Sequence, residues 1–149
     1  MPDNNLFPVV EIPEYIEGNE EYDVDYKPSV AWDLEKGDFV RSPSFAMVRN
    51  DGLEAFKVWC IKTVATERYT CLAYDNDIGT EMEDAMKEAD ENAVELAIER
   101  TIEEALKVNP RTESVEDFEF TWEPSVVKVK FTVFAVYWEN FDLEVELRR

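Results

Sequence analysis

The chain contains 149 residues, with 35 Asp or Glu against 15 Lys or Arg, so its formal net charge is −20 at pH 7. It has no histidine, which excludes Ser-His-Asp triads, Cys-His pairs and His-ligated zinc. The acidity opposes contact with phosphate backbones, so we expect no nucleic-acid partner. With 45% hydrophobic residues, a chain of this length is expected to fold as one domain.

The sequence carries no sign of a membrane segment. No apolar run approaches the roughly 20 residues of a membrane span, and the first residues lack the basic and apolar regions of a signal peptide. We therefore expect no membrane partner, and synthesis in the cytoplasm.

Residues 1–28 differ from the rest of the chain. They hold four of the seven prolines and a dense acidic run over residues 17–25. Proline interrupts helices and like charges repel, which predicts an extended acidic arm. Apolar residues are spaced along it, so the arm either lies on a surface, its own or a partner's, or is a loosely packed leader. Residues 29–149 are then a single domain.

Residues 29–48 predict a small hairpin region. Alternating residues over 29–34 and the segments 39–41 and 45–48 indicate short strands, and Gly37 marks a turn after the first of them.

A helix is predicted directly after this region. Asp51 is a candidate N-cap, and Glu54 three residues later would complete a capping box for a helix that ends near Thr66. The following segments are, in order, a short strand over 69–74, a turn over 75–79 and one or two helical turns over 80–86.

The strongest helix signal covers residues 88–108, where small and aliphatic side chains recur at helical spacing. Pro110 ends this helix, and Asn109 before it is disfavoured in the α conformation, which predicts a sharp turn into Arg111.

After this turn the periodicity changes from helical to alternating. The predicted strands cover residues 118–122, 126–136 and 141–147. We therefore predict an α+β fold, in which an antiparallel sheet of three to four strands packs against two main helices.

No residue pattern singles out a catalytic or metal site. Acidic pairs are frequent, but 35 acids in one chain produce such pairs by chance. The Asp75-Asn-Asp77 stretch lacks the acid that a calcium loop needs at its twelfth position, which is Met86. Cys60 and Cys71 lie in apolar surroundings, so we expect two buried thiols without chemistry. No cofactor or metal is predicted.

Several stretches together resemble one protein family. They are Asn109-Pro110-Arg111 at the end of the long helix, residues 51–69, 74–79 and 81–84, and two shorter pieces at 37–40 and 114–120. The chain resembles the small baseplate-wedge, or sheath-initiator, family of contractile phage tails and tail-like bacteriocins, particularly its branch from Gram-positive hosts. The resemblance covers about residues 30 to 147. The family is sometimes labelled lysozyme-like, but this sequence singles out no catalytic pair.

The resemblance implies a structural protein without catalysis or cofactor. Six copies would sit between the baseplate wedge and the first sheath ring, in contact with the larger wedge proteins and the tail sheath protein. The acidic arm over 1–28 would be available to tail tube or hub proteins. Assembly would take place in the bacterial host cytoplasm, and the protein would end in the baseplate of a phage or bacteriocin particle.

Two sites follow from the resemblance. Family members carry a Glu-Pro-Arg motif that docks onto the wedge proteins; here Pro110 and Arg111 match, and Asn109 replaces the acid. The alternative for Arg111 is that it caps the carbonyls of its own helix.

The second implied site is a strand that pairs with the sheath protein. Its residues are Phe141, Asp142, Leu143, Glu144, Val145, Glu146 and Leu147. A strand near the chain's end can offer an edge, and its acidic face would favour a basic partner strand. The alternative is an edge strand that its charges merely protect.

The leading hypothesis is therefore an assembly protein that links wedge to sheath and initiates the sheath by strand pairing. The alternative is an acidic binding module, such as a nucleic-acid mimic or inhibitor. A small glycosidase is a third hypothesis, which would need a carboxylate with a raised pKa in a cleft.

Overall fold

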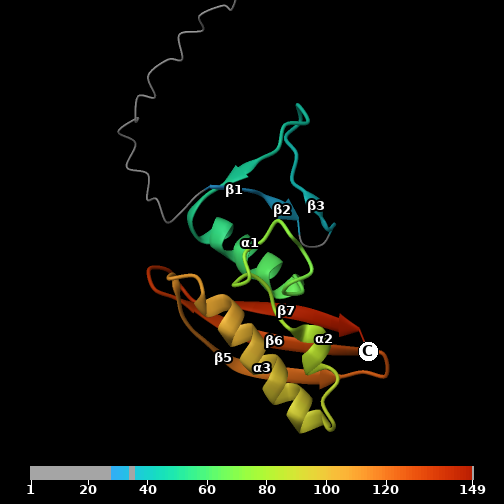
Figure 1. Cartoon of the computed structure of the whole chain (residues 1–149). Helices are drawn as coiled ribbons and strands as arrows, with labels where there is room; N and C mark the ends of the chain where they lie inside the picture. The colour runs from blue at the N-terminus through green and yellow to red at the C-terminus, as the bar shows by residue number, and fades with distance from the viewer. Residues whose placement is uncertain (1–27, 34–35, 149) are drawn as a thin grey trace, which may run out of the picture.

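The computed structural model describes residues 28–33 and 36–148 (Figure 1). The elements are β1 (Ser29–Val30), β2 (Trp32–Asp33), β3 (Asp38–Phe39), β4 (Arg49–Asn50), α1 (Gly52–Ala65), α2 (Met82–Ala85), α3 (Glu91–Lys107), β5 (Thr112–Trp122), β6 (Val126–Ala135) and β7 (Phe141–Arg148). The predicted α+β class is confirmed. Apart from Pro28, the predicted extended arm over residues 1–28 lies outside the described residues.

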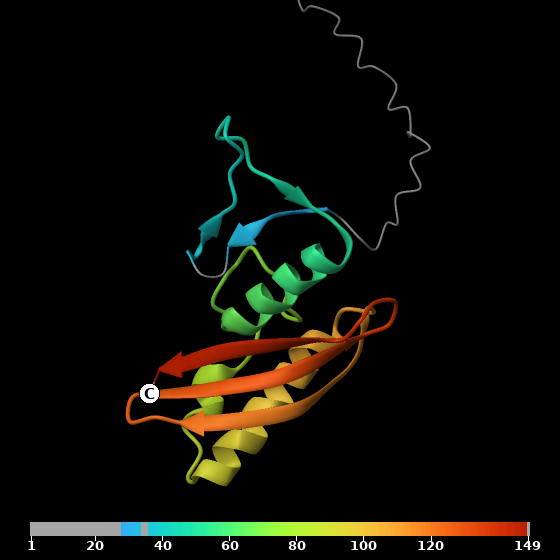
Figure 2. The ribbon, with the colours of Figure 1, turned by 180° about the vertical axis from the view of Figure 1, so that it is seen from behind.

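The main sheet has three antiparallel strands in the order β5-β6-β7. The helices lie on one side of it, and the view from behind shows the opposite face of the sheet uncovered (Figure 2). Strand β6 is central, and its alternate residues are buried while their neighbours are not. This period of two is what a sheet covered on one face requires.

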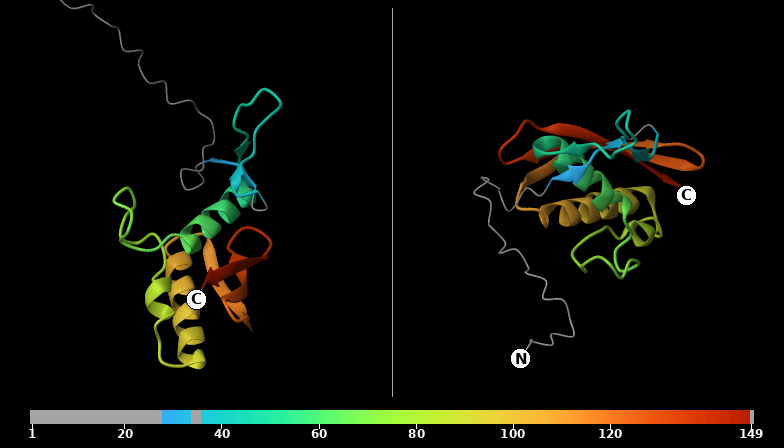
Figure 3. Two further views of the ribbon diagram at one scale, coloured as in Figure 1. Left: turned by 90° about the vertical axis from the view of Figure 1, so that its right-hand side faces the viewer. Right: turned by 90° about the horizontal axis from the view of Figure 1, so that it is seen from above.

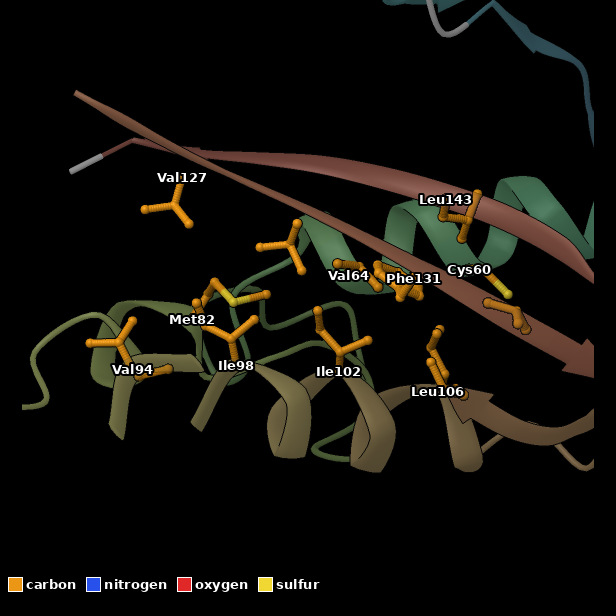
Figure 4. Packing of buried hydrophobic residues seen from close by; sticks show 14 of the residues in the cluster. Cys60, Val64, Met82, Val94, Ile98, Ile102, Leu106, Val127, Phe131 and Leu143 are labelled. Atoms are coloured by element: carbon orange, nitrogen blue, oxygen red, sulfur yellow. The ribbon is translucent and has the colours of Figure 1, made fainter. Parts of the chain in front are cut away.

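The core lies between this sheet and α3. Ile98, Ile102 and Leu106, spaced one helical turn apart, are fully buried and face the sheet (Figure 4). Phe131 of β6 is also fully buried in the same cluster. Helix α1 adds a second set of buried residues, Phe56, Cys60 and Val64.

The outer face of the sheet is polar. Lys130 of β6 lies 3.0 Å from the carboxylate of Asp142 on β7. Lys128 lies 2.9 Å from Glu123 and 3.9 Å from Glu146. The hydrogen bonds from Lys130 and Thr132 hold the pKa of Asp142 below its usual value. Charged pairs therefore cross the strands on the side that the helices leave open.

Residues 29–33 and 36–50 form a separate small β unit beside α1 (Figures 1 and 3). Strand β1 pairs with β4, and β2 pairs with β3 around the predicted turn, where Gly37 has φ 65°. Trp32 and Phe39 stack edge to face with ring centroids 4.9 Å apart. The predicted hairpin around Gly37 is confirmed. The predicted strand over residues 45–48 is wrong, since only Met47 forms an isolated bridge, with Arg41, and β4 begins at Arg49.

The predicted capping box at the start of α1 is wrong. Asp51 occupies the N-cap position, but its side chain makes no capping hydrogen bond. Gly52, the first residue of α1, has φ 59°, and this changes the direction from which the Asp51 side chain approaches the first turn of the helix. Glu54 instead pairs with Lys57 at 2.9 Å.

The predicted strand over 69–74 is also wrong. This segment consists of turns and bends within a loop between α1 and α2, which stands away from the helices in Figure 3. Arg68 closes the loop by donating two hydrogen bonds, of 3.0 and 3.2 Å, to the Gly79 carbonyl. A Cβ at Gly79 would lie 2.8 Å from the Thr66 carbonyl oxygen, so only glycine fits there.

The long helix and the strands after it are confirmed with shifted boundaries. Helix α3 begins at Glu91, because the Asp90 carboxylate accepts the Ala93 N–H at 2.9 Å and caps it there. Strand β5 begins at Thr112, six residues before the predicted start, and contains a bulge at Asp117, where φ is 56°. Over the described ranges, no helix is long and apolar enough to cross a bilayer.

Packing of α3 on the sheet gives a direct stability prediction. Ile102→Ala should lower the free energy of unfolding by about 2 to 5 kcal/mol, because it leaves a cavity in the centre of the core. Leu96→Ala on the same helix, where the side chain is 66% exposed, should change it by less than about 0.5 kcal/mol. Urea denaturation followed by circular dichroism measures both; equal effects would contradict this account of the core.

Candidate functional site

The turn after α3 is held by a compact set of hydrogen bonds. The Leu106 carbonyl accepts the Thr112 hydroxyl at 2.7 Å and the Asn109 N–H at 3.2 Å. The Asn109 carbonyl accepts the Thr112 N–H at 3.0 Å. These bonds satisfy carbonyls that the helix end leaves open. They also fix the path of the chain through Pro110 into β5.

Asn109 and Arg111, two of the predicted wedge-binding residues, interact within this turn. The Asn109 side-chain oxygen accepts the Arg111 N–H at 3.1 Å. The Arg111 side chain is folded inward, since the residue is only 4% exposed, and its guanidinium lies over the Trp138 ring at 5.8 Å. Arg111 is therefore placed beneath the surface of the turn, whereas Pro110 is exposed.

Sequence reasoning missed two residues of this site. Thr112 supplies the hydroxyl that caps the last turn of α3, a role that the alternative interpretation had given to Arg111. Trp138 comes from the loop between β6 and β7 and lies against both Arg111 and Phe56. The sequence has no pattern that marks Thr112 as a helix cap. The contact between Arg111 and Trp138 joins residues 27 positions apart, so the spacing of neighbouring residues does not indicate it.

An exposed apolar surface surrounds this turn. The Val136 N–H donates to the Arg111 carbonyl at 2.9 Å and so joins the β6–β7 loop to the helix end. Val108 and Val136 are 46% exposed and Tyr137 is 76% exposed. We call Val108, Pro110, Val136 and Tyr137 the helix-end patch. An apolar surface of this kind at the end of a folded domain is typical of a protein contact.

The predicted sheath-pairing residues form β7, at one edge of the main sheet. Eight consecutive residue pairs join β7 to β6, from Val126–Arg148 to Val133–Phe141. Within the described chain, no strand pairs with the other side of β7. Asp142, Glu144 and Glu146 are exposed, while Leu143 faces the core.

The opposite edge strand, β5, is less regular. Its pairing with β6 shifts register twice, between Thr112 and Ser114 and between Glu116 and Glu119. Bulges of this kind interrupt the row of backbone groups that a new strand needs. Strand β7 is therefore the better template of the two edges.

Among the described residues, the carboxyl group with a raised pKa, that of Glu99, lies apart from the pocket with the carboxylate lining. The pKa of Glu99 is raised first by burial and then by repulsion from Glu95 and Glu103, which lie on the same helix, α3. Glu99 does not line the pocket between α2 and α3, whose carboxylates come from Glu81, Asp84, Glu88 and Glu104. Nothing in this arrangement favours the glycosidase hypothesis.

The cysteine prediction is half right. Cys60 is fully buried, and this burial raises the pKa of its thiol. Cys71 is exposed, because the segment around it is a surface loop and not the predicted strand. The described residues contain no group of three or more Cys, Asp or Glu placed to hold a metal ion.

A sheet with one regular open edge, and an apolar patch at the end of its main helix, characterise a protein that assembles with other proteins. The sequence matches the family model of the contractile injection system sheath initiator over residues 29–137. The chain belongs to this family. A search of curated proteins found no match to the chain.

Membership of the family sets the general role. The family is structural, so the chain takes part in sheath initiation in a contractile injection system, in contact with sheath or baseplate components. This favours the leading hypothesis over the acidic binding module. The matched range includes the helix-end turn but ends before β7, and the match is to the family as a whole and not to single residues. Both predicted binding sites therefore remain predictions.

The Thr112 cap gives a second stability prediction. Thr112→Val should lower the free energy of unfolding by about 1 kcal/mol, because it removes the hydroxyl donor to the Leu106 carbonyl while keeping the side-chain shape. Thr121→Val, at an exposed position on the same strand, is the control and should be neutral or slightly stabilising. Thermal denaturation compares the two, and an unchanged Thr112→Val would contradict the cap.

Proposed function

We propose that this chain links the baseplate wedge to the first ring of the sheath, and that it initiates the sheath by pairing a sheath strand with β7. The observation that carries this proposal is the unbroken ladder between β6 and β7, which leaves a regular backbone edge on the other side of β7. Adding a strand to such an edge provides main-chain hydrogen bonds at every second residue.

The charge of β7 supports a basic partner strand. Asp142, Glu144 and Glu146 alternate along its outer face. Two copies of this edge would place like charges opposite each other, which disfavours self-pairing, whereas Lys or Arg on an incoming strand would be attracted. The same acids can therefore protect the edge before assembly and select the partner during it.

The helix-end patch is the proposed wedge-binding surface. It contains Pro110, and Arg111 lies directly beneath it against Trp138. Arg111 then acts by positioning the turn and the β6–β7 loop, and the exposed residues of the patch make the contact. The patch lies at one end of the sheet and the C-terminal end of β7 at the other (Figure 1). Two partners can therefore bind without overlap.

The remaining parts of the proposal rest on the family alone. Six copies of the chain would surround the tail, one for each wedge. Residues 29–149 would form the domain that contacts wedge and sheath, and the arm over 1–28 would contact tail tube or hub proteins. The chain would assemble in the bacterial host cytoplasm and remain in the particle's baseplate.

Proline substitutions test the strand-pairing step. Along an antiparallel strand, successive N–H groups point alternately toward one neighbour and toward the other side. One of the two variants Val145→Pro and Glu146→Pro therefore removes a hydrogen bond to β6, and the other removes only an N–H group that points away from β6. The variant that keeps the wild-type melting profile should lose at least tenfold in affinity for the purified sheath protein of the same particle, measured by biolayer interferometry.

Leu72→Pro, at a fully exposed residue of the α1–α2 loop, is the control and should keep full sheath binding. Full sheath binding by the folded proline variant would disprove pairing on β7. Absence of sheath binding by the wild-type chain would disprove the sheath link altogether.

Two tyrosine substitutions, one in the helix-end patch and one far from it, test the wedge contact. Tyr137→Ser removes an aromatic side chain of the helix-end patch that is 76% exposed, and should weaken capture of the purified wedge proteins by about tenfold. Tyr69→Ser, at a residue that is 66% exposed on the distant α1–α2 loop, should leave capture unchanged. Equal losses for both variants would contradict a wedge contact at the patch.

A further inference from the structure

An apolar pocket lies where the end of β7 meets α2. It encloses about 420 Å³ and is open to the surface. Met82, Met86 and Leu147 provide its apolar lining, and Lys87, Glu146 and Arg148 are among its charged lining residues. Met82 belongs to the buried core, and Met86 and Leu147 pack against that core, so the pocket continues the interior of the protein to the edge of the sheet.

The alternation of β7 shows on which side of the sheet the pocket lies. Leu147 pairs with Val127, which is fully buried, and both belong to the helix-facing side of the sheet. Glu144 and Glu146 point to the opposite face. Side chains directly opposite each other on neighbouring strands share a face. A residue paired with Leu147 from an added strand would therefore point toward α2, into this pocket.

We propose that the pocket receives one large apolar side chain of the strand that pairs with β7, and that this side chain fixes the register of pairing. The inference rests on the proposed function, because it requires a strand on the β7 edge. The partner strand would carry a Leu, Ile, Met or Phe opposite Leu147 and basic residues opposite Glu144 and Glu146.

Charge alone cannot fix this register. The acids of β7 recur at every second position, at Asp142, Glu144 and Glu146. A partner strand that slips by two residues keeps its basic side chains opposite acids and its apolar side chains on the helix side. The pocket lies at a single position, opposite Leu147, so it distinguishes the correct register from a slipped one when only one helix-side residue of the partner strand is large enough to fill it. Backbone bonds and charges then supply affinity, and the pocket supplies alignment.

Substitutions of Met86 test the pocket without changing net charge. Met86→Asn should weaken binding of the purified sheath protein of the same particle by about tenfold, because a polar amide would be buried against the incoming apolar side chain. Met86→Leu should bind within about twofold of the wild type. Leu96→Asn makes the same kind of apolar-to-amide change at a 66% exposed position on α3 and should not alter binding.

The folded proline variant of β7 is measured in the same series. If it loses the sheath protein while folded Met86→Asn binds normally, the pocket inference is wrong and strand pairing stands. If the folded proline variant binds normally, strand pairing fails, and the pocket inference fails with it. Loss of binding in Leu96→Asn as well would also overturn the pocket, since the effect would not be local.

A measurement on the wild-type chain avoids any folding defect of the variants. Methionine labelled with carbon-13 in its methyl group gives separate NMR signals for Met82 and Met86 in the pocket and for Met47 on the distant hairpin, where it is 58% exposed. Addition of the sheath protein should shift or broaden the Met86 signal more than that of Met47. An unchanged Met86 signal under conditions of sheath binding would overturn the proposal.

Discussion

Packing of one apolar stripe of α3 against one face of the sheet determines how the rest of the molecule is arranged. Ile98, Ile102 and Leu106 are fully buried there together with Phe131. Because the helices of the described residues lie on that side, the other face of the sheet is polar, and there Lys128 and Lys130 of β6 pair with Glu123 of the β5–β6 turn and Asp142 of β7. Strand β7 is an edge strand of this sheet because the strand order is β5-β6-β7.

The same packing separates the two proposed contacts. Strands β6 and β7 run the length of the sheet in opposite directions, so the loop between them lies at the end where α3 meets β5. Arg111 and Trp138 join that loop to the helix end. The C-terminal residues of β7 lie at the other end, beside α2 and the methionine pocket. The distance between the two partners would then be set by the length of the sheet.

The sequence predicted those features whose cause is local. The period of α3, the proline after it and the alternation of β7 each reflect neighbouring residues, and each is present in the structure. The features it missed depend on distant contacts. The loop around Leu72 is closed by Arg68 on the Gly79 carbonyl, and the inward position of Arg111 depends on Trp138. The pocket combines Met86 and Leu147, which are 61 positions apart and show no common pattern.

The helix-end turn also explains how Asn109 can stand at the position where the resemblance implies an acid. Its side-chain oxygen accepts the Arg111 N–H at 3.1 Å, a bond that a neutral amide makes as readily as a carboxylate. With the Thr112 hydroxyl on the Leu106 carbonyl, this bond holds the turn without any charge at position 109. The shape of the turn is therefore independent of the missing carboxylate. A partner that binds the helix-end patch would recognise this shape and the apolar residues on it, because Arg111 lies beneath the surface and Asn109 carries no charge.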